Sequence, residues 1–138
     1  MRFLWCILLS LTLYSLTFAQ TNTGALGTPD TNLYYMDEVD VAPQFPGGMD
    51  SLLAFFRNNI VVPSKAKESN NQGTVYISFV ITETGAVSNI DAIRRIGAGC
   101  DEEAMRVAAL MPLWTPGMKN EKPVKTKLVL PVHFMGHD

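Results

Sequence analysis

The stretch GAGCDEEAMRVAALMPLWTPGMKNEKPVKTKLVLPVHF, residues 97–134, decides the fold of this chain. Gly97-Ala98-Gly99 ends a preceding strand, and the acidic residues 101–103 then begin a helix, where carboxylates interact favourably with the helix dipole. Small and apolar residues recur at helical spacing and predict the face that packs on a sheet: Ala104, Val107, Ala108 and Met111. Met111-Pro112 predicts the end of this helix.

From Val124 to Phe134 apolar and polar side chains alternate, which predicts a half-buried β-strand. Pro131 lies inside this strand, and proline has no N–H to donate to a neighbouring strand. Lys125 and Lys127 add charge of the kind that protects an exposed edge from indiscriminate pairing. The last strand is therefore predicted to be an edge strand.

The residues upstream predict a helix and a hairpin. Five apolar residues fall on one helical face after the glycine turn at Gly47-Gly48: Met49, Leu52, Leu53, Phe56 and Ile60. Asn58-Asn59 with Pro63 mark the stop of the helix. After a polar segment, residues 65–72, alternation over residues 74–82 predicts a strand. Gly85 suits a turn that needs a positive φ, and Val87–Ile96 predicts the second strand. Its alternation changes phase between Val87 and Ile90, which predicts a bulge.

A hairpin, a helix across it and a returning strand predict an α+β fold. We expect a small three-stranded antiparallel sheet in the order second–first–third, packed against two helices on one face. Residues 118–122 are expected to form a polar turn before the last strand.

Residues 1–19 are expected to be a signal peptide. Arg2 precedes an apolar run of 16 residues, 3–18, and Thr17-Phe18-Ala19 places small residues where a signal peptidase cleaves. The alternative is a retained anchor, although the run is shorter than the ~20 residues of a spanning helix. We expect a tether at residues 20–41, whose end, residues 33–41, lies against the domain, and one domain at residues 42–138.

Composition and motifs predict neither nucleic-acid binding nor catalysis. The 138 residues include 11 basic and 13 acidic side chains, a net charge of −2, with no basic run longer than Arg94-Arg95. His133 and His137 lie on a strand and in a tail, so we expect no metal site, no cofactor and no enzymatic activity. Cys100 is interpreted as a small buried side chain, with a reactive or chain-linking thiol as the alternative.

Several motifs together are similar to the C-terminal domain of TonB, in the form common in Bacteroidetes, over about residues 40–135. They are Phe45-Pro46-Gly47-Gly48 before the first helix, Gly73-Thr74-Val75, the acidic helix start with Asp101, residues 111–117 with Trp114, Pro116 and Gly117, and residues 130–134 with Pro131. Trp114 itself is expected to pack over the end of the sheet, since its flanks are apolar.

The resemblance implies a periplasmic domain that captures the TonB box, a short extended segment of an outer-membrane transporter, as a strand beside its own last strand. It implies that the binding residues are Val124, Lys125, Thr126, Lys127, Leu128, Val129 and Leu130. Energy transducers of the family keep an N-terminal helix that engages a proton-driven motor, and a long spacer. The part of the tether from Gln20 to Asp40 has 21 residues and spans at most about 75 Å. A homodimer paired through the exposed edge and a membrane-anchored energy transducer are the alternatives.

Overall fold

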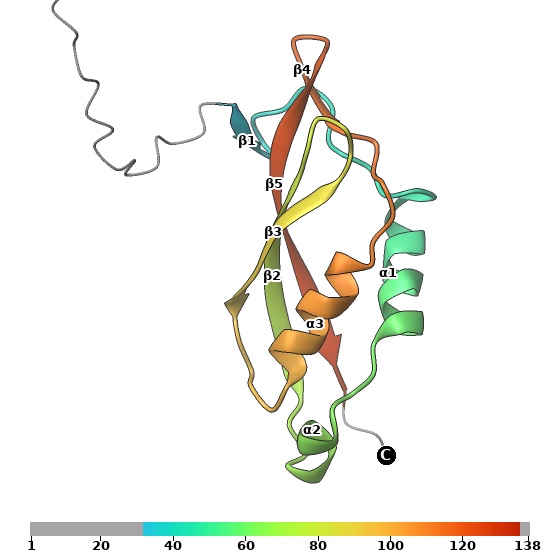
Figure 1. Cartoon of the computed structure of the whole chain (residues 1–138), viewed down its shortest axis with the longest axis vertical. Helices are drawn as coiled ribbons and strands as arrows, with labels where there is room; N and C mark the ends of the chain where they lie inside the picture. The colour runs from blue at the N-terminus through green and yellow to red at the C-terminus, as the bar shows by residue number, and fades with distance from the viewer. Residues whose placement is uncertain (1–31, 136–138) are drawn as a thin grey trace, which may run out of the picture.

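The computed structural model describes residues 32–135 (Figure 1). The expected signal peptide, most of the expected tether and His137 lie outside the described residues. In chain order the elements are β1 (Leu33–Tyr35), α1 (Gly48–Asn59), α2 (Ser64–Glu68), β2 (Gly73–Ile81), β3 (Val87–Arg94), α3 (Cys100–Ala109), β4 (Gly117–Lys119) and β5 (Lys122–Phe134). No helix among residues 32–135 is both long enough and apolar enough to cross a membrane.

The centre of the sheet is the antiparallel trio β3-β2-β5. Strand β2 pairs with β3 on one side and with β5 on the other, where nine pairs run from Gly73↔Phe134 to Ile81↔Thr126 without a register shift. The predicted α+β class and the order second–first–third are confirmed. The predicted count of three strands is wrong, because β1 and β4 each add a short strand alongside β5 and the sheet has five.

Strand β3 is irregular at the place where its alternation changes phase. The register shifts between the pairs Ser78↔Asp91 and Val80↔Ser88, and Asn89 between them has a φ of 50°. An extra residue on one strand of a pair bends that strand and interrupts its ladder. The predicted bulge is therefore confirmed, and a second shift lies between Tyr76 and Ile77.

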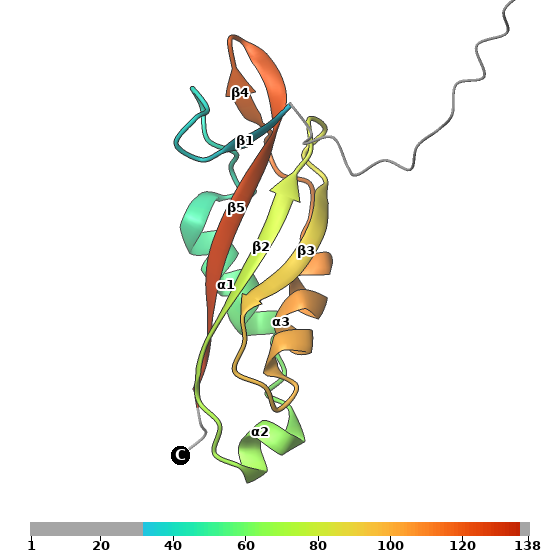
Figure 2. The same cartoon turned by 90° about the vertical axis from the view of Figure 1, so that its left-hand side faces the viewer.

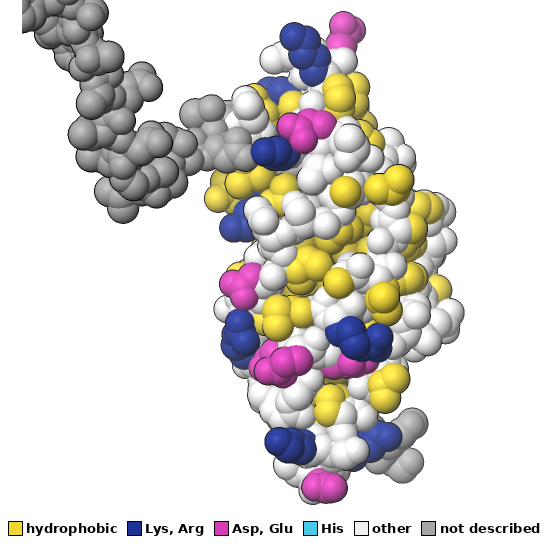
Figure 3. Space-filling view, in the orientation of Figure 1, with side chains coloured by type: hydrophobic (Ala, Val, Ile, Leu, Met, Phe, Trp, Pro, Cys, Tyr) yellow, Lys and Arg dark blue, Asp and Glu magenta, His cyan; other side chains and the backbone are white. Residues whose placement is uncertain are grey.

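Both long helices lie on one face of the sheet, α1 behind β5 and α3 behind β3 (Figure 2). The core between them contains alternate residues of β2 and the small face of α3, all at most 1% exposed: Val75, Ile77, Phe79, Ile81, Ala104, Val107 and Ala108. Alanines allow α3 to approach the sheet closely. On the side of the molecule shown in Figure 3, hydrophobic side chains gather in the middle and charged ones are spread around them.

Helix α1 buries less of its apolar stripe than its sequence predicts. Leu52 and Phe56 are buried, but Met49 and Leu53 are 63% and 48% exposed. The helix lies behind β5 at the side of the sheet (Figure 2), so only part of its apolar face reaches the core.

Two connections also differ from expectation. The polar segment 65–72 contains the short helix α2, with Ala66 buried. The turn expected at residues 118–122 is tighter, because β4 pairs with β5 around the two residues Asn120 and Glu121, whose φ values of 49° and 62° suit a two-residue hairpin turn.

Candidate functional site: the outer side of β5

The side of β5 that faces away from β2, here called its outer side, is partly covered. Strand β1 runs parallel to β5 on this side, in the register Leu33↔Lys125, Tyr34↔Thr126 and Tyr35↔Lys127. The end of the expected tether therefore lies against the domain, as predicted. Thr126 and Lys127 have strand neighbours on both sides, because Ile81 and Val80 of β2 pair with them from the inner side.

The outer side is open further along the strand. Within residues 32–135, no strand pairs with the outer side of residues 128–134, which we call the open edge. The prediction of an edge strand is thus correct for the open edge and wrong for Lys125–Lys127. Of the seven predicted binding residues, Val124 pairs with Gly117 of β4, residues 125–127 pair with β1, and residues 128–130 belong to the open edge.

Pro131 lies opposite Tyr76 within the unbroken β2–β5 register. Because proline has no N–H, it fits a sheet where its nitrogen faces away from the neighbouring strand. Residues two apart in a strand direct their backbone groups to the same side. Val129, which is 51% exposed, therefore directs its N–H to the same side as the nitrogen of Pro131, toward the open edge.

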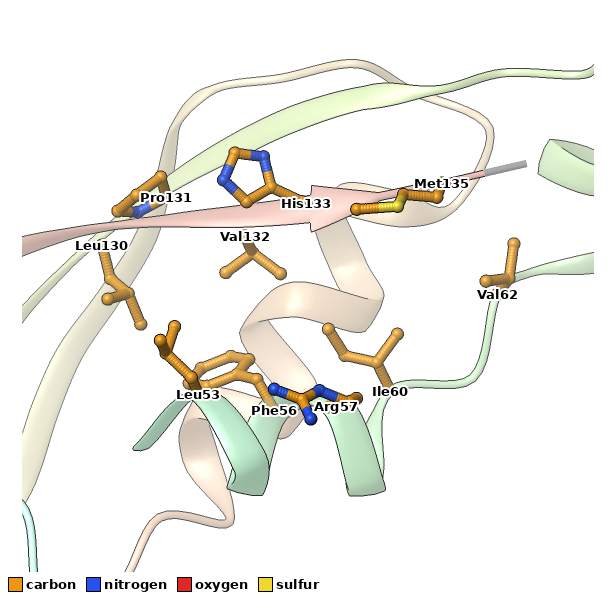
Figure 4. A pocket seen from close by; sticks show the side chains of 10 residues that line it. All are labelled: Leu53, Phe56, Arg57, Ile60, Val62, Leu130, Pro131, Val132, His133 and Met135. Atoms are coloured by element: carbon orange, nitrogen blue, oxygen red, sulfur yellow. The ribbon is translucent and has the colours of Figure 1, made fainter. Parts of the chain in front are cut away.

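An apolar groove of 480 Å³ lies beside the open edge, between β5 and α1 (Figure 4). Leu130 and Val132 point from β5 toward α1, while His133 lies on the opposite face of the strand. The Nδ1 atom of His133 is 2.8 Å from Thr74 Oγ1, so this imidazole pairs within the sheet. The groove is lined by Leu53, Phe56, Arg57, Ile60, Val62, Leu130, Pro131, Val132, His133 and Met135.

The other edge of the sheet is less suited to pairing. No strand lies beyond β3 among residues 32–135, but β3 carries two register shifts. Bulges of this kind protect edge strands from adding a further strand. The nine pairs between β2 and β5 contain no register shift, so no bulge of this kind protects the open edge.

The acidic start of α3 is structural. The carboxylate of Asp101 accepts hydrogen bonds from the N–H groups of Ile96 (2.9 Å) and Gly97 (3.0 Å), which fixes the loop after β3. Glu103 accepts from the N–H of Val61 (2.7 Å), and its ion pair with Arg106 also measures 2.7 Å. In the described part of the chain, no three His, Cys, Asp or Glu side chains are grouped so that they could hold a metal ion.

Cys100 is fully buried, as the sequence indicates. Burial raises the pKa of its thiol, and the negative charges of Asp101 and Glu102 raise it further. A raised pKa disfavours the thiolate, which is the reactive form of cysteine.

Trp114 packs in the core, also as predicted. Its side chain is 6% exposed, and its ring lies 5.5 Å from the ring of Phe45 and 5.7 Å from that of Phe79. Phe45 thereby joins the turn before α1 to the sheet. Gly117 approaches β5 closely, since a Cβ atom there would lie 2.3 Å from Thr126 Oγ1. These motif residues therefore belong to the scaffold that supports β5.

Two features of the site were missed by sequence reasoning. One is the parallel pairing of β1 with β5, and the other is the groove formed with α1. The apolar stripe of α1 could have indicated the groove. It includes Leu53 and Ile60 in addition to the buried residues, so it is wider than the core contact requires.

The family model for the Gram-negative bacterial TonB protein C-terminal matches residues 58–135, more than half of the chain, so the chain belongs to this family. Membership supports a TonB-like role in transport across the cell envelope. Two solution structures of the Helicobacter pylori TonB C-terminal domain are similar to this chain. One, of its residues 194–285, has 21% identity and a TM-score of 0.44, covering 62% of this chain and 89% of that one. The other, of its residues 179–285, has 20% identity and a TM-score of 0.47, covering 67% and 88%. No curated protein matches the chain.

Proposed function

We propose that this chain is a periplasmic TonB-like binding module that captures an extended segment of an outer-membrane TonB-dependent transporter by β-strand addition. The observation that carries the proposal is the open edge, residues 128–134, next to an apolar groove. In strand addition the backbone hydrogen bonds supply affinity, and pockets for alternate side chains supply selectivity.

The groove lies where one set of those side chains would fall. Successive side chains of a strand point to opposite faces of the sheet. A segment added beside β5 would direct every second side chain toward α1, over the apolar groove, and the others toward the face that carries His133. The proposed partner therefore has apolar residues at alternate positions. Pro131 limits the number of hydrogen bonds that such a segment forms.

Peptide binding by two variants at Val129 tests the proposal. Val129→Pro removes an N–H from the open edge at a position equivalent to Pro131, and Val129→Ala removes the side chain while keeping that N–H. The probe is a synthetic peptide copied from the periplasmic N-terminal segment of a TonB-dependent transporter of the same bacterium. Fluorescence anisotropy should show binding to the original protein and to Val129→Ala, and at least about tenfold weaker binding to Val129→Pro, since a hydrogen bond is lost and the strand conformation perturbed.

Equal binding by the two variants would rule out strand addition at this edge, provided that both unfold at the same denaturant concentration as the original protein. Binding by none of the three proteins would rule out capture of the transporter segment.

The same open edge favours a second candidate, a structural or assembly domain that forms a homodimer by pairing residues 128–134 with those of a second copy. Analytical ultracentrifugation at micromolar concentration separates the two. A protein that sediments as a monomer and still binds the peptide is not such a dimer.

Export to the periplasm is part of the proposal and rests on the sequence pattern of residues 1–19. Mass spectrometry of the N-terminus of the protein isolated from cells tests it. A chain that begins at Gln20 supports the periplasmic module. A chain that keeps residues 1–19 supports instead an anchored energy transducer that contacts motor proteins of the inner membrane.

A further inference from the structure

Strand β1 occupies a part of β5 that an added strand would also use. Its three residues pair with Lys125, Thr126 and Lys127, and the open edge begins at the next residue, Leu128. The inner side of Thr126 and Lys127 is already paired with β2. A second strand can therefore reach these residues from the outer side only when β1 has left.

We propose that β1 is an internal competitor for the strand-addition site, which closes residues 125–127 and on release extends the open edge from residues 128–134 to residues 125–134. The inference rests on the proposed function, because a competitor matters only if the outer side of β5 binds a partner. In the absence of a partner, β1 itself covers residues 125–127 of β5. The partner that displaces β1 is an extended peptide segment.

The contact that holds β1 is small. A pairing of three residues forms few hydrogen bonds, and short segments of this kind open locally at much lower free energy than the whole fold. Leu33 and Tyr34 are partly buried, and Tyr35 is 54% exposed. Detachment of β1 therefore breaks few backbone bonds, and its apolar cost is limited to the two side chains of Leu33 and Tyr34.

The chain after β1 is fastened to the domain independently. The N–H groups of Asp40 and Val41 donate to the carbonyl oxygen of Met118 (2.8 and 3.1 Å), and the N–H of Met118 donates back to Val41 (2.9 Å). The N–H of Asn120 also donates to Asp40 Oδ2 (2.7 Å). The carbonyl oxygen of Glu38 also accepts a hydrogen bond from Lys119 Nζ. These bonds to the β4–β5 hairpin remain when β1 leaves, so the chain stays attached to the domain directly after the strand that is released.

Two hydrogen bonds close a turn at the end of β1. The N–H of Tyr35 donates to Glu38 Oε2 (2.7 Å), and the N–H of Glu38 donates to the carbonyl oxygen of Tyr35 (3.0 Å). Both bonds join residues three apart, and neither joins β1 to β5. Release of β1 from β5 therefore does not require that these two bonds break.

The consequence is a reduced apparent affinity for any partner that needs residues 125–127. The apparent dissociation constant rises as the fraction of molecules with β1 released falls. Because β1 runs parallel to β5, a segment that replaces it in the same register runs in that direction too.

A reversible cross-link tests the proposal. Tyr35 and Lys127 lie opposite each other and neither is buried. Tyr35→Cys with Lys127→Cys therefore places two cysteines on neighbouring strands whose backbones are about 4.8 Å apart, a separation that fits the Cα–Cα range of a disulfide. Oxidation holds β1 on β5 and reduction frees it, in one and the same protein. The buried Cys100 is shielded from this reaction.

The probe is the transporter peptide described above, measured by fluorescence anisotropy. We expect the oxidised form to bind it at least about tenfold more weakly than the reduced form. In a second pair, Tyr34→Pro, which prevents pairing of β1, should bind more tightly than Tyr34→Phe, which preserves it. If the oxidised and reduced forms bind equally, and the two Tyr34 variants also bind equally, β1 does not compete for the strand-addition site. Absence of binding by every form would instead overturn the proposed function.

Discussion

The backbone N–H of Trp114 donates a 2.8 Å hydrogen bond to the carbonyl oxygen of Gly85. This bond joins the segment after α3 to the turn between β2 and β3 and fixes the backbone of a core residue. The contact requires glycine, because residue 85 has a φ of 86° and a Cβ atom there would lie 1.9 Å from the carbonyl oxygen of Trp114.

Gly85→Ala is therefore expected to lower the free energy of unfolding by about 3 kcal/mol or more, from the left-handed conformation together with the clash. Gly97→Ala is a matched control, since Gly97 has a φ of 76° and an added Cβ would meet no atom within 4 Å. It should cost about 1 kcal/mol. Urea unfolding measures both, and equal losses would show that the contact with Trp114 contributes nothing.

Glu103 should make stability depend on acidic pH. The hydrogen bond from Arg106 lowers the pKa of Glu103, and the N–H of Val61 lowers it further, against the opposing effect of burial. The folded state thus binds fewer protons than the unfolded state. The stabilisation is complete above the unfolded-state pKa of about 4.3 and is lost as the pH falls through the lower, folded-state value.

We expect Glu103→Gln to be less stable than the original protein at neutral pH, with a smaller fall in unfolding free energy as the pH decreases below about 4.5. Urea unfolding across this range gives the comparison. Glu102→Gln, in the same helical turn, controls for the general loss of one carboxylate. An unchanged pH dependence in Glu103→Gln would contradict the role given to the network with Arg106.

The groove should contribute to peptide binding through its apolar lining. Leu53 is 48% exposed at the groove, and Leu110, at the end of α3 and outside the groove lining, is 53% exposed. Leu53→Lys should weaken binding of the transporter peptide about tenfold, because apolar contact area is lost and a charged side chain is placed in the groove where apolar side chains of the peptide would lie. Leu110→Lys should change the affinity by less than about twofold. Similar effects of the two substitutions would show that the groove is not part of the interface.

The parts of the fold that follow from local pattern were predictable. Alternation identified β2, β3 and β5, the phase change in β3 located its bulge, and small residues identified the face of α3 that packs on the sheet. Pro131 also indicated an edge, since its missing N–H has a direct consequence for pairing. Each of these signals lies within a few neighbouring residues.

The parts that depend on distant segments were not predictable. Residues 33–35 are too few to show a periodic pattern, and their sequence does not indicate which strand they pair with. In the structure they pair in parallel with residues 125–127. Burial on α1 likewise depends on where the helix lies relative to β5, so Leu53 has the same pattern as Phe56 but lines an open groove. The open edge correspondingly lies further toward the C-terminus of β5 than the predicted binding residues.

Hydrogen exchange measured by NMR during titration with the transporter peptide tests the central claim most directly. Strand addition at the open edge predicts slower exchange of outward-facing amides such as that of Val129, with shift changes at Leu53 and Ile60 in the groove. Protection confined to β3 at the opposite edge, or binding that leaves the exchange of residues 128–134 unchanged, would contradict the account.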